Sequence, residues 1–129
     1  MIYKVISLKG IKEINKRFNL NLTCSGDIEN DTRLAVNNLL YTAYQKSKNS
    51  SSKTKSSAKK IADFIKSNHY EWSIDSEVDS IIKKISHSTS KKYTWEEDNI
   101  SLQNIQARVR SPFIWFIANT NNLLLLSTS

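Results

Sequence analysis

The sequence contains very little glycine, proline or cysteine. Its 129 residues include two glycines, one proline and one cysteine. Because Cys24 has no second cysteine in the sequence to pair with, an internal disulfide is excluded and a reducing compartment is favoured. The glycines, Gly10 and Gly26, stand alone, so the sequence lacks the glycine-rich loop that surrounds phosphate groups in many nucleotide-binding proteins.

Long hydrophobic runs are also absent. No segment offers the roughly 18 uninterrupted apolar residues that a membrane helix needs, so we expect no membrane span. The first ten residues have too short an apolar run, and no small-residue cleavage site, for a signal peptide. Since 39% of the residues are hydrophobic, the sequence still provides a core for one domain of ordinary size. Because we expect neither a membrane span nor a signal peptide, we expect a cytoplasmic protein.

The sequence carries an excess of positive charge, with 19 Lys and Arg residues against 12 Asp and Glu residues. A basic surface is typical of proteins that bind nucleic acid. However, the densest basic stretch, KSKNSSSKTKSSAKK (46–60), has no aromatic side chain to stack on bases. Solvated lysines on helix faces therefore account better for the charge, and we expect no nucleic-acid binding. A non-catalytic basic module that binds nucleic acid or a partner protein remains the alternative function.

Hydrophobic periodicity predicts helices that alternate with strands in the first two thirds of the sequence. The predicted helix over 2–18 is weakened in its middle by Gly10. Asp75 is expected to cap the helix that carries Val78, Ile81, Ile82 and Ile85. The other predicted elements are a polar loop (19–31), a short helix (31–38), a strand (39–44), a loop (45–53), a helix (53–67), a strand (69–75) and a polar loop (86–93).

The last third of the sequence predicts a long helix and a final strand. Thr94 and Glu97 form a T-x-x-E capping box, so the helix should begin near Trp95. Pro112 should bend this helix or end its first half, because it removes one backbone donor. A turn at 119–122 then leads to a strand over 123–127. Its consecutive leucines do not alternate with polar residues, which is typical of a parallel strand buried on both faces.

Strands that are separated by helices predict an α/β fold with parallel pairing through right-handed crossovers. In such sheets the carboxyl ends of the strands line the ligand crevice. No complete catalytic or metal-binding pattern is present. His69 and His87 lack metal-ligand spacing and are expected to face solvent, Cys24 is expected to be an inert thiol, and the acidic residues before the last helix are expected to compensate its dipole.

Two arginines stand out in the segment NIQARVRSPFIWFIANTNN. Arg108 and Arg110 lie on different sides of the predicted helix, and both are surrounded by apolar positions. A buried guanidinium needs an anionic partner, because an unpaired buried charge is very costly. Spacing alone leaves two readings equally open, a salt bridge to a carboxylate or a clamp for a ligand phosphate or carboxylate.

The segments TAYQKSKNSSSKTKSSAKKIADFI, YEWSID and YTWEEDNISLQNIQARVRSPFIWFIANTNNLLLLSTS closely resemble the synthetase domain of NAD(+) synthetases. The likeness is to the glutamine-hydrolysing bacterial type, which belongs to the N-type ATP pyrophosphatases. It is strong over 39–129 and weak over 1–38, which would be the helix and variable loop after the first strand of the family. The resemblance implies a partial three-layer parallel sheet with flanking helices, as in adenine-nucleotide alpha-hydrolase-like folds.

The resemblance also implies a reaction and several binding residues. The family uses ATP and Mg²⁺ to amidate deamido-NAD (nicotinic acid adenine dinucleotide) to NAD, with glutamine or ammonia as the nitrogen source. Arg108 matches an arginine that contacts deamido-NAD, and Thr128 matches a threonine that contacts ATP. Their separation, 128 − 108 = 20, agrees with the family. Tyr44 and Gln45 lie where the family approaches the adenine, although Lys46 stands where the family usually has glycine. Arg110 keeps the salt-bridge reading.

Other parts of the family pattern are missing from the 129 residues. The Ser-Gly-Gly-x-Asp-Ser loop would precede Met1, and the Asn-Arg-Ser-Glu segment would follow Ser129, so neither metal-binding carboxylate is present. We therefore expect a fragment with no catalytic residue and no metal ligand, which is inactive by itself. Family synthetase domains form homodimers, so we expect a homodimer or association with a full-length synthetase. The leucine-rich end is expected to form an inner strand, with Arg108 and Thr128 side by side at its rim.

Overall fold

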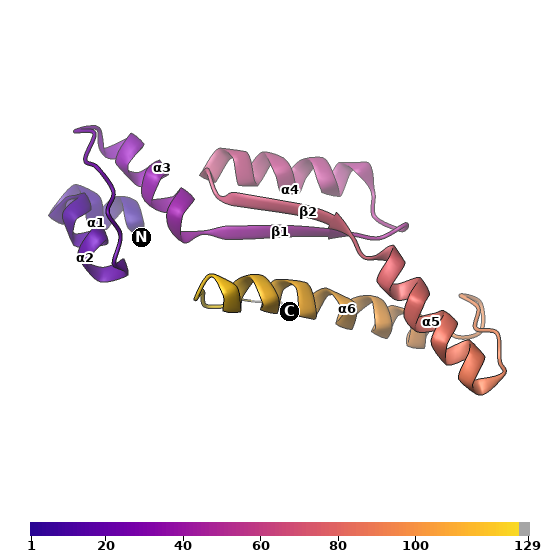
Figure 1. Cartoon of the computed structure of the whole chain (residues 1–129). Helices are drawn as coiled ribbons and strands as arrows, with labels where there is room; N and C mark the ends of the chain where they lie inside the picture. The colour runs from indigo at the N-terminus through magenta and orange to yellow at the C-terminus, as the bar shows by residue number, and fades with distance from the viewer. Residues whose placement is uncertain (127–129) are drawn as a thin grey trace. The chain divides into compact units, whose positions relative to one another are not determined.

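The computed structural model describes residues 1–126 and shows an α/β fold (Figure 1). The chain divides into two compact units. The first comprises residues 1–44 and 51–70, and the second comprises residues 45–50 and the chain from Glu71 onward. Each unit has its own buried cluster, and the two strands contribute residues to both units.

The first unit begins with two helices, α1 (Ile2–Lys9) and α2 (Ile11–Phe18), instead of the single helix predicted over 2–18. The interruption is at Gly10, whose φ of 75° and ψ of 167° are far from helical values and are readily adopted only by glycine. Because the chain turns there, Ile6 and Ile14 enter the same cluster with Ala35. Partly buried residues pack around this cluster: Ile2, Val5, Leu20, Leu22 and Leu39.

Helix α3 (Ile28–Leu39) begins three residues earlier than the predicted 31–38. Asp27 caps it by accepting the Glu29 backbone N–H at 2.9 Å. Asp31 is buried, and its carboxylate accepts the Ser25 backbone N–H and hydroxyl, both at 2.8 Å. The Ser25 backbone N–H, followed by its hydroxyl, holds the pKa of Asp31 below its ordinary value. This carboxylate therefore fixes the end of the loop that precedes α3.

Strands β1 (Tyr41–Lys46) and β2 (Asn68–Ser73) form a two-stranded sheet, joined through α4 (Ser52–Ile65). At one end of the sheet Asn68 N–H donates to Leu40 O, and at the other end Ile74 N–H donates to Lys46 O. Both bonds join residues that are 28 apart (68 − 40 and 74 − 46), and a constant separation along the two strands means that they run in the same direction. Figure 1 shows both arrows pointing the same way. Strand β1 lies two residues later than predicted and takes up the start of the predicted loop.

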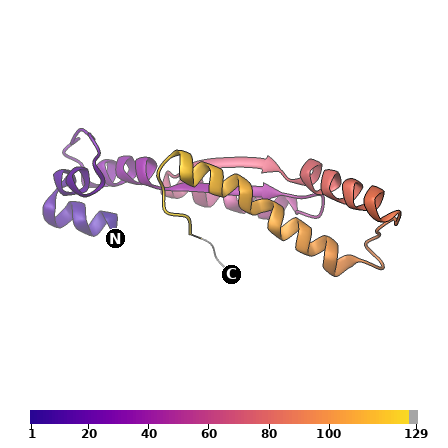
Figure 2. The same ribbon diagram turned by 60° about the horizontal axis from the view of Figure 1, so that its bottom comes forward.

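The second unit holds α5 (Asp75–Thr89) and α6 (Asn99–Thr120), which follow one another in the chain and contact each other (Figures 1 and 2). Ile74, Val78 and Val109 are buried between them. Partly buried residues enclose this cluster: Trp72, Ile81, Ile82, Ile105 and Phe113. Val109 and Phe113 of α6 thus belong to the packed cluster, whereas Ile100 and Phe116 of the same helix are exposed.

Helix α6 begins at Asn99, four residues after the predicted start near Trp95. Glu97 N–H does donate to Thr94 Oγ1 at 3.3 Å, as in a capping box, but Thr94 N–H donates to Asp98 at 3.1 Å and not to Glu97. These bonds close a turn in front of the helix. Pro112 lies inside α6 without ending it, so the helix continues to Thr120.

The leucine-rich end is not a strand in the part of the chain that the structure describes. Residues 123–126 have no regular secondary structure, and Leu124 and Leu126 are 85% and 81% exposed. A strand needs a hydrogen-bonded neighbour, and β1 and β2 pair only with each other within residues 1–126. Leu123 N–H instead donates to Ala118 O at 2.8 Å, which keeps the chain folded back onto the end of α6. The predicted strand is therefore wrong over 123–126, and Ser127 lies outside the described residues.

Candidate functional site

The carboxyl ends of β1 and β2 define the candidate site. Ligands of parallel sheets bind beyond the carboxyl ends of the strands, because the loops that leave the strands there are free to form a crevice. Here β1 leads into residues 47–50 and β2 leads through Ile74 into α5. The Ile74 N–H to Lys46 O bond, at 3.0 Å, keeps the two strand ends together.

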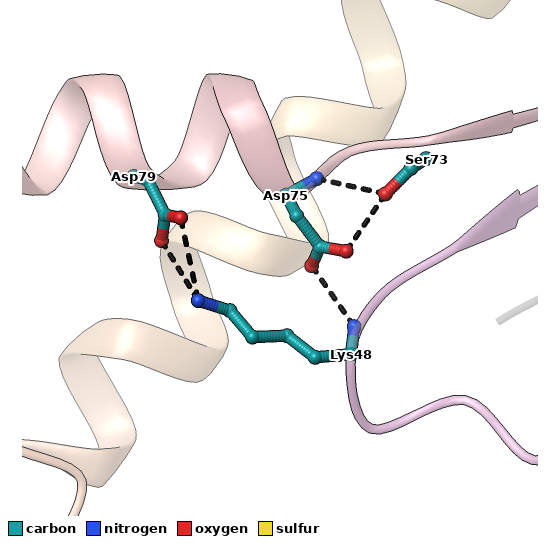
Figure 3. Close-up of polar contacts among 4 residues, drawn as sticks. All are labelled: Lys48, Ser73, Asp75 and Asp79. Carbon is teal, nitrogen blue, oxygen red and sulfur yellow. Dashed lines mark hydrogen bonds and ion pairs between the residues drawn. The ribbon is translucent and has the colours of Figure 1, made fainter.

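Asp75 links the loop after β1 to the end of β2 (Figure 3). One carboxylate oxygen accepts the Lys48 backbone N–H at 2.9 Å, and the other accepts the Ser73 hydroxyl at 2.7 Å. The Ser73 hydroxyl, then the Lys48 N–H, hold the pKa of Asp75 below its ordinary value. Asp75 was predicted to cap α5, but it is the first helical residue, and its carboxylate binds the neighbouring loop instead. It therefore fixes the loop at the candidate site.

The loop after β1 is compact. Ser47 is 8% exposed, and Ser50 N–H donates to Ser47 O at 2.8 Å while Ser47 N–H donates to Ser50 Oγ at 2.9 Å. The Lys48 ammonium reaches Asp79 at 3.1 Å, but both side chains are more than half exposed, so this ion pair adds little stability. The loop is thus shaped by its serines and by Asp75 more than by its charge.

Tyr44 and Gln45, the residues predicted to approach the adenine, lie near the carboxyl end of β1. Their side chains point to opposite faces of the sheet, because successive residues of a strand alternate. Tyr44 is half-buried, whereas Gln45 Oε1 is fully buried without a hydrogen-bond partner among residues 1–126. Lys46 is the last residue of β1 and extends the strand, a conformation that needs no glycine. Of these two residues, Gln45 is therefore the one with a buried, unpaired polar atom at this edge.

Arg108 and Arg110 lie on α6, as predicted. Arg108 is exposed, and its Nη1 donates to Asn104 Oδ1 at 2.8 Å and weakly to Asn104 O at 3.4 Å. Arg110 is half-buried, and its Nη1 donates to the Gln106 carbonyl at 2.7 Å. Within residues 1–126 Arg110 makes no ion pair, so its predicted salt bridge is wrong there. Arg108 is the arginine whose guanidinium is open to an anionic ligand.

The remaining site predictions have mixed outcomes. Thr128 lies outside the described residues, so its position beside Arg108 stays a prediction. His69 is half-buried and hydrogen-bonded through Nδ1 to Thr42 Oγ1 at 2.9 Å, so its predicted solvent exposure is wrong, whereas His87 is exposed as predicted. Cys24 is an exposed free thiol whose Sγ lies 3.3 Å from Asp31 Oδ2.

Sequence reasoning missed the contacts that join distant segments at this edge. Asp75 binds Lys48, 27 residues away, and no local pattern indicates that bond. The predicted parallel sheet could have indicated this bond in general terms, because parallel pairing brings the residues that follow β1 and β2 to the same edge of the sheet. Sequence reasoning also missed Trp72, whose buried indole N–H has no partner among residues 1–126.

The described residues offer neither a clustered metal site nor a membrane-spanning helix. Within residues 1–126 no group of three or more His, Cys, Asp or Glu side chains is arranged to hold a metal ion. No helix in the same part of the chain is both long and apolar enough to span a membrane.

Comparison with known proteins gives a consistent result. The family model for NAD synthase matches residues 31–129. A glutamine-dependent NAD(+) synthetase from Oryza sativa subsp. indica is 35% identical over 73% of this chain, and the match covers only 14% of that protein. The Mus musculus protein of the same name is 36% identical over 68% of this chain, and the match covers 13% of it. The corresponding Saccharomyces cerevisiae protein is 28% identical over 92% of this chain, and the chain spans 18% of it.

A solved structure matches over nearly the whole chain. The crystal structure of a glutamine-dependent NAD(+) synthetase from Cytophaga hutchinsonii superposes with a TM-score of 0.91 and 34% identity. The match covers 99% of this chain and 23% of that protein. The fold, the identity and the family model agree along the same residues, and the chain therefore belongs to the NAD synthase family.

Proposed function

We propose that this chain is the part of an ATP-dependent ligase that holds the substrates while deamido-NAD is amidated to NAD, with glutamine or ammonia as the nitrogen source. The observation that carries the proposal is the family match over residues 31–129 together with the TM-score of 0.91 to a synthetase. The chain spans about one seventh of the rice relative, so the complete reaction also needs residues outside these 129.

The chemistry converts a poor leaving group into a good one. ATP adenylylates the nicotinate carboxylate of deamido-NAD and releases pyrophosphate, and ammonia then attacks the acyl adenylate and displaces AMP. The nicotinate carboxylate and the phosphates of ATP carry negative charge, so the protein must supply cations and hydrogen-bond donors. Mg²⁺ serves the family in this role, although residues 1–126 offer no ligand cluster for it.

Arg108 is the residue that we assign to deamido-NAD. Its guanidinium has the planar fork that suits phosphate and carboxylate groups. The Asn104 side chain holds one end of the guanidinium at 2.8 Å and leaves other donors available. Gln45, Tyr44 and Thr128 are assigned to ATP, with Gln45 and Tyr44 at the edge that Asp75 and the loop after β1 form.

A chimeric enzyme tests the proposal. The chain replaces the matching segment of the Cytophaga hutchinsonii synthetase, and NAD formation is measured from deamido-NAD, ATP, Mg²⁺ and ammonia. We expect the chimera to form NAD and the isolated 129-residue chain to form none. A soluble, folded chimera that forms no NAD contradicts the proposed function, and turnover by the isolated chain contradicts its proposed dependence on further residues.

A further inference from the structure

We propose that Trp72 and Gln45 together form a hydrogen-bonding pair that recognises the adenine of ATP. Among residues 1–126, Gln45 Oε1 and Trp72 Nε1 are the buried side-chain polar atoms that lack any hydrogen-bond partner. One is an acceptor and the other is a donor. Native proteins rarely leave such atoms unpaired, because each loses its bond to water and gains nothing in return.

The register of the sheet places the two residues side by side. In a parallel ladder, a carbonyl accepts the N–H of the residue one beyond its lateral neighbour. Since Lys46 O accepts from Ile74 N–H, Lys46 lies beside Ser73, and Gln45 lies beside Trp72. Lateral neighbours of parallel strands share a face, so the amide of Gln45 and the indole of Trp72 are on the same face.

A second pair confirms this register independently. Thr42 and His69 are 27 residues apart (69 − 42), as are Gln45 and Trp72 (72 − 45), and their side chains are hydrogen-bonded at 2.9 Å. Gln45 and Trp72 are also the second-last residues of β1 and β2. The unpaired donor and acceptor therefore lie at the carboxyl edge of the sheet, where ligands of parallel sheets bind.

The pair is complementary to one edge of adenine. Adenine offers a donor, the N6 amino group, next to an acceptor, N7. Gln45 Oε1 can accept from the amino group while Trp72 Nε1–H donates to N7. Hypoxanthine has a carbonyl in place of the amino group and would face Gln45 Oε1 with a second acceptor. The pair should therefore distinguish adenine from hypoxanthine.

The packing of Trp72 supports a fixed donor. Its ring packs against Phe113 of α6, with ring centroids 5.6 Å apart and an interplanar angle of 43°. Ile74, which follows the last residue of β2 and precedes α5, is fully buried. A ring held in this way keeps its N–H direction constant, which a selective hydrogen bond requires. This inference rests on the proposed function, which assigns ATP to this edge.

The first test follows the indole N–H signals of the full chain by NMR. The sequence has three tryptophans, so a ¹⁵N-labelled chain gives three indole signals, and Trp72→Phe identifies the signal of Trp72. We expect adenosine to shift this signal, and inosine to bind at least about tenfold more weakly, which is the effect of roughly one hydrogen bond (about 1.4 kcal/mol). Equal responses to the two nucleosides, or no response to either, overturn the proposal.

Gln45→Leu separates a ligand-binding role from a structural one. It replaces the unpaired acceptor with an apolar group of similar size, so we expect a higher urea midpoint together with loss of the adenosine response. The control is Gln103→Leu, which changes an exposed glutamine on α6 and should leave both unchanged. A lower midpoint in Gln45→Leu would mean that Oε1 has a partner within the protein, and would overturn the proposal.

The chimeric synthetase provides a second readout that does not depend on the isolated chain. There, Gln45→Leu and Trp72→Phe should each raise KM for ATP about tenfold and leave KM for deamido-NAD unchanged. An active chimera in which neither variant changes KM for ATP refutes the adenine pair alone. Conversely, the Trp72 signal of the isolated chain could respond selectively to adenosine while the folded chimera forms no NAD. That result refutes the proposed amidation and leaves the adenine pair standing.

Discussion

Replacing Ile74 by alanine should loosen the second unit selectively. Ile74 is fully buried and lies between β2 and α5, where it packs with Val78 and Val109. The first unit has its own cluster, formed around Ile6 and Ile14. Because the two clusters share no residue, a cavity at Ile74 should act mainly on α5 and α6.

The magnitude follows from the atoms removed. Isoleucine has three more carbons than alanine, and about 0.8 kcal/mol per buried carbon gives a transfer loss of about 2.4 kcal/mol. The cavity left behind raises such losses to about 2–5 kcal/mol in measured cases. With a urea m-value of about 1–3 kcal/mol per molar, the midpoint should fall by about 1–2 M. The exposed Ile61, 62% accessible, provides the control Ile61→Ala, for which we expect less than about 0.5 kcal/mol.

Hydrogen exchange followed by mass spectrometry locates the effect. In Ile74→Ala, amides of α5 and α6 should exchange faster while those of α1, α2 and α3 keep their protection. Equal loss of protection in both groups of helices would refute the reasoning, because it would show one cooperative core. A midpoint shift no larger than that of Ile61→Ala would refute the assigned burial.

Three further predictions concern single polar or backbone features. The hydrogen bonds from Ser25 hold the pKa of Asp31 below its ordinary value of 3.8. The ionised carboxylate therefore stabilises the fold above pH 3.8, and this stability is lost as the pH falls through the lowered pKa of the folded state. In Asp31→Asn, which lacks this carboxylate, the urea midpoint should depend less on pH in the same acid range. Gly10→Ala should cost about 1–3 kcal/mol in urea unfolding, since a Cβ there meets no atom within 4 Å and only the φ of 75° opposes it. Asp75→Ala should speed hydrogen exchange at the Lys48 amide, and unchanged protection would show that the carboxylate does not hold the loop.

The alternation of helices and strands was readable from the sequence because it depends on local periodicity. The patterns around 53–67 and 69–75 correspond to α4 and β2 within a few residues. Boundaries moved where one side chain or one backbone angle decided them. Gly10 divided a continuous apolar pattern into two helices, and Asp98 replaced Glu97 in the turn before α6.

The leucine-rich end shows a limit of local patterns. Four consecutive leucines are typical of a buried parallel strand, but a strand also needs a neighbour, and none pairs with residues 123–126 within the described chain. The exposed Leu124 and Leu126 contradict the prediction of an inner strand. Family membership rests instead on the match over residues 31–129 and on the structural superposition.

The candidate site was partly predictable. Arg108 was singled out by its apolar surroundings and by the resemblance; the structure shows it exposed on α6, and its contact with a ligand stays a prediction. Arg110 has similar surroundings, but its Nη1 donates to the Gln106 carbonyl one helical turn earlier, which no charge pattern reveals. The pairing of Gln45 with Trp72 required the strand register, since periodicity gives the face of each residue but not its lateral neighbour.

The role of Arg108 provides the most direct test of the account. In the chimeric synthetase, Arg108→Ala should raise KM for deamido-NAD at least about tenfold while KM for ATP stays the same, because the lost guanidinium contacts only one substrate. Arg33→Ala, which removes an exposed arginine paired with Glu29 on α3, should leave both constants unchanged. If Arg108→Ala has the same deamido-NAD kinetics as Arg33→Ala, the assignment of this chain to substrate binding is contradicted.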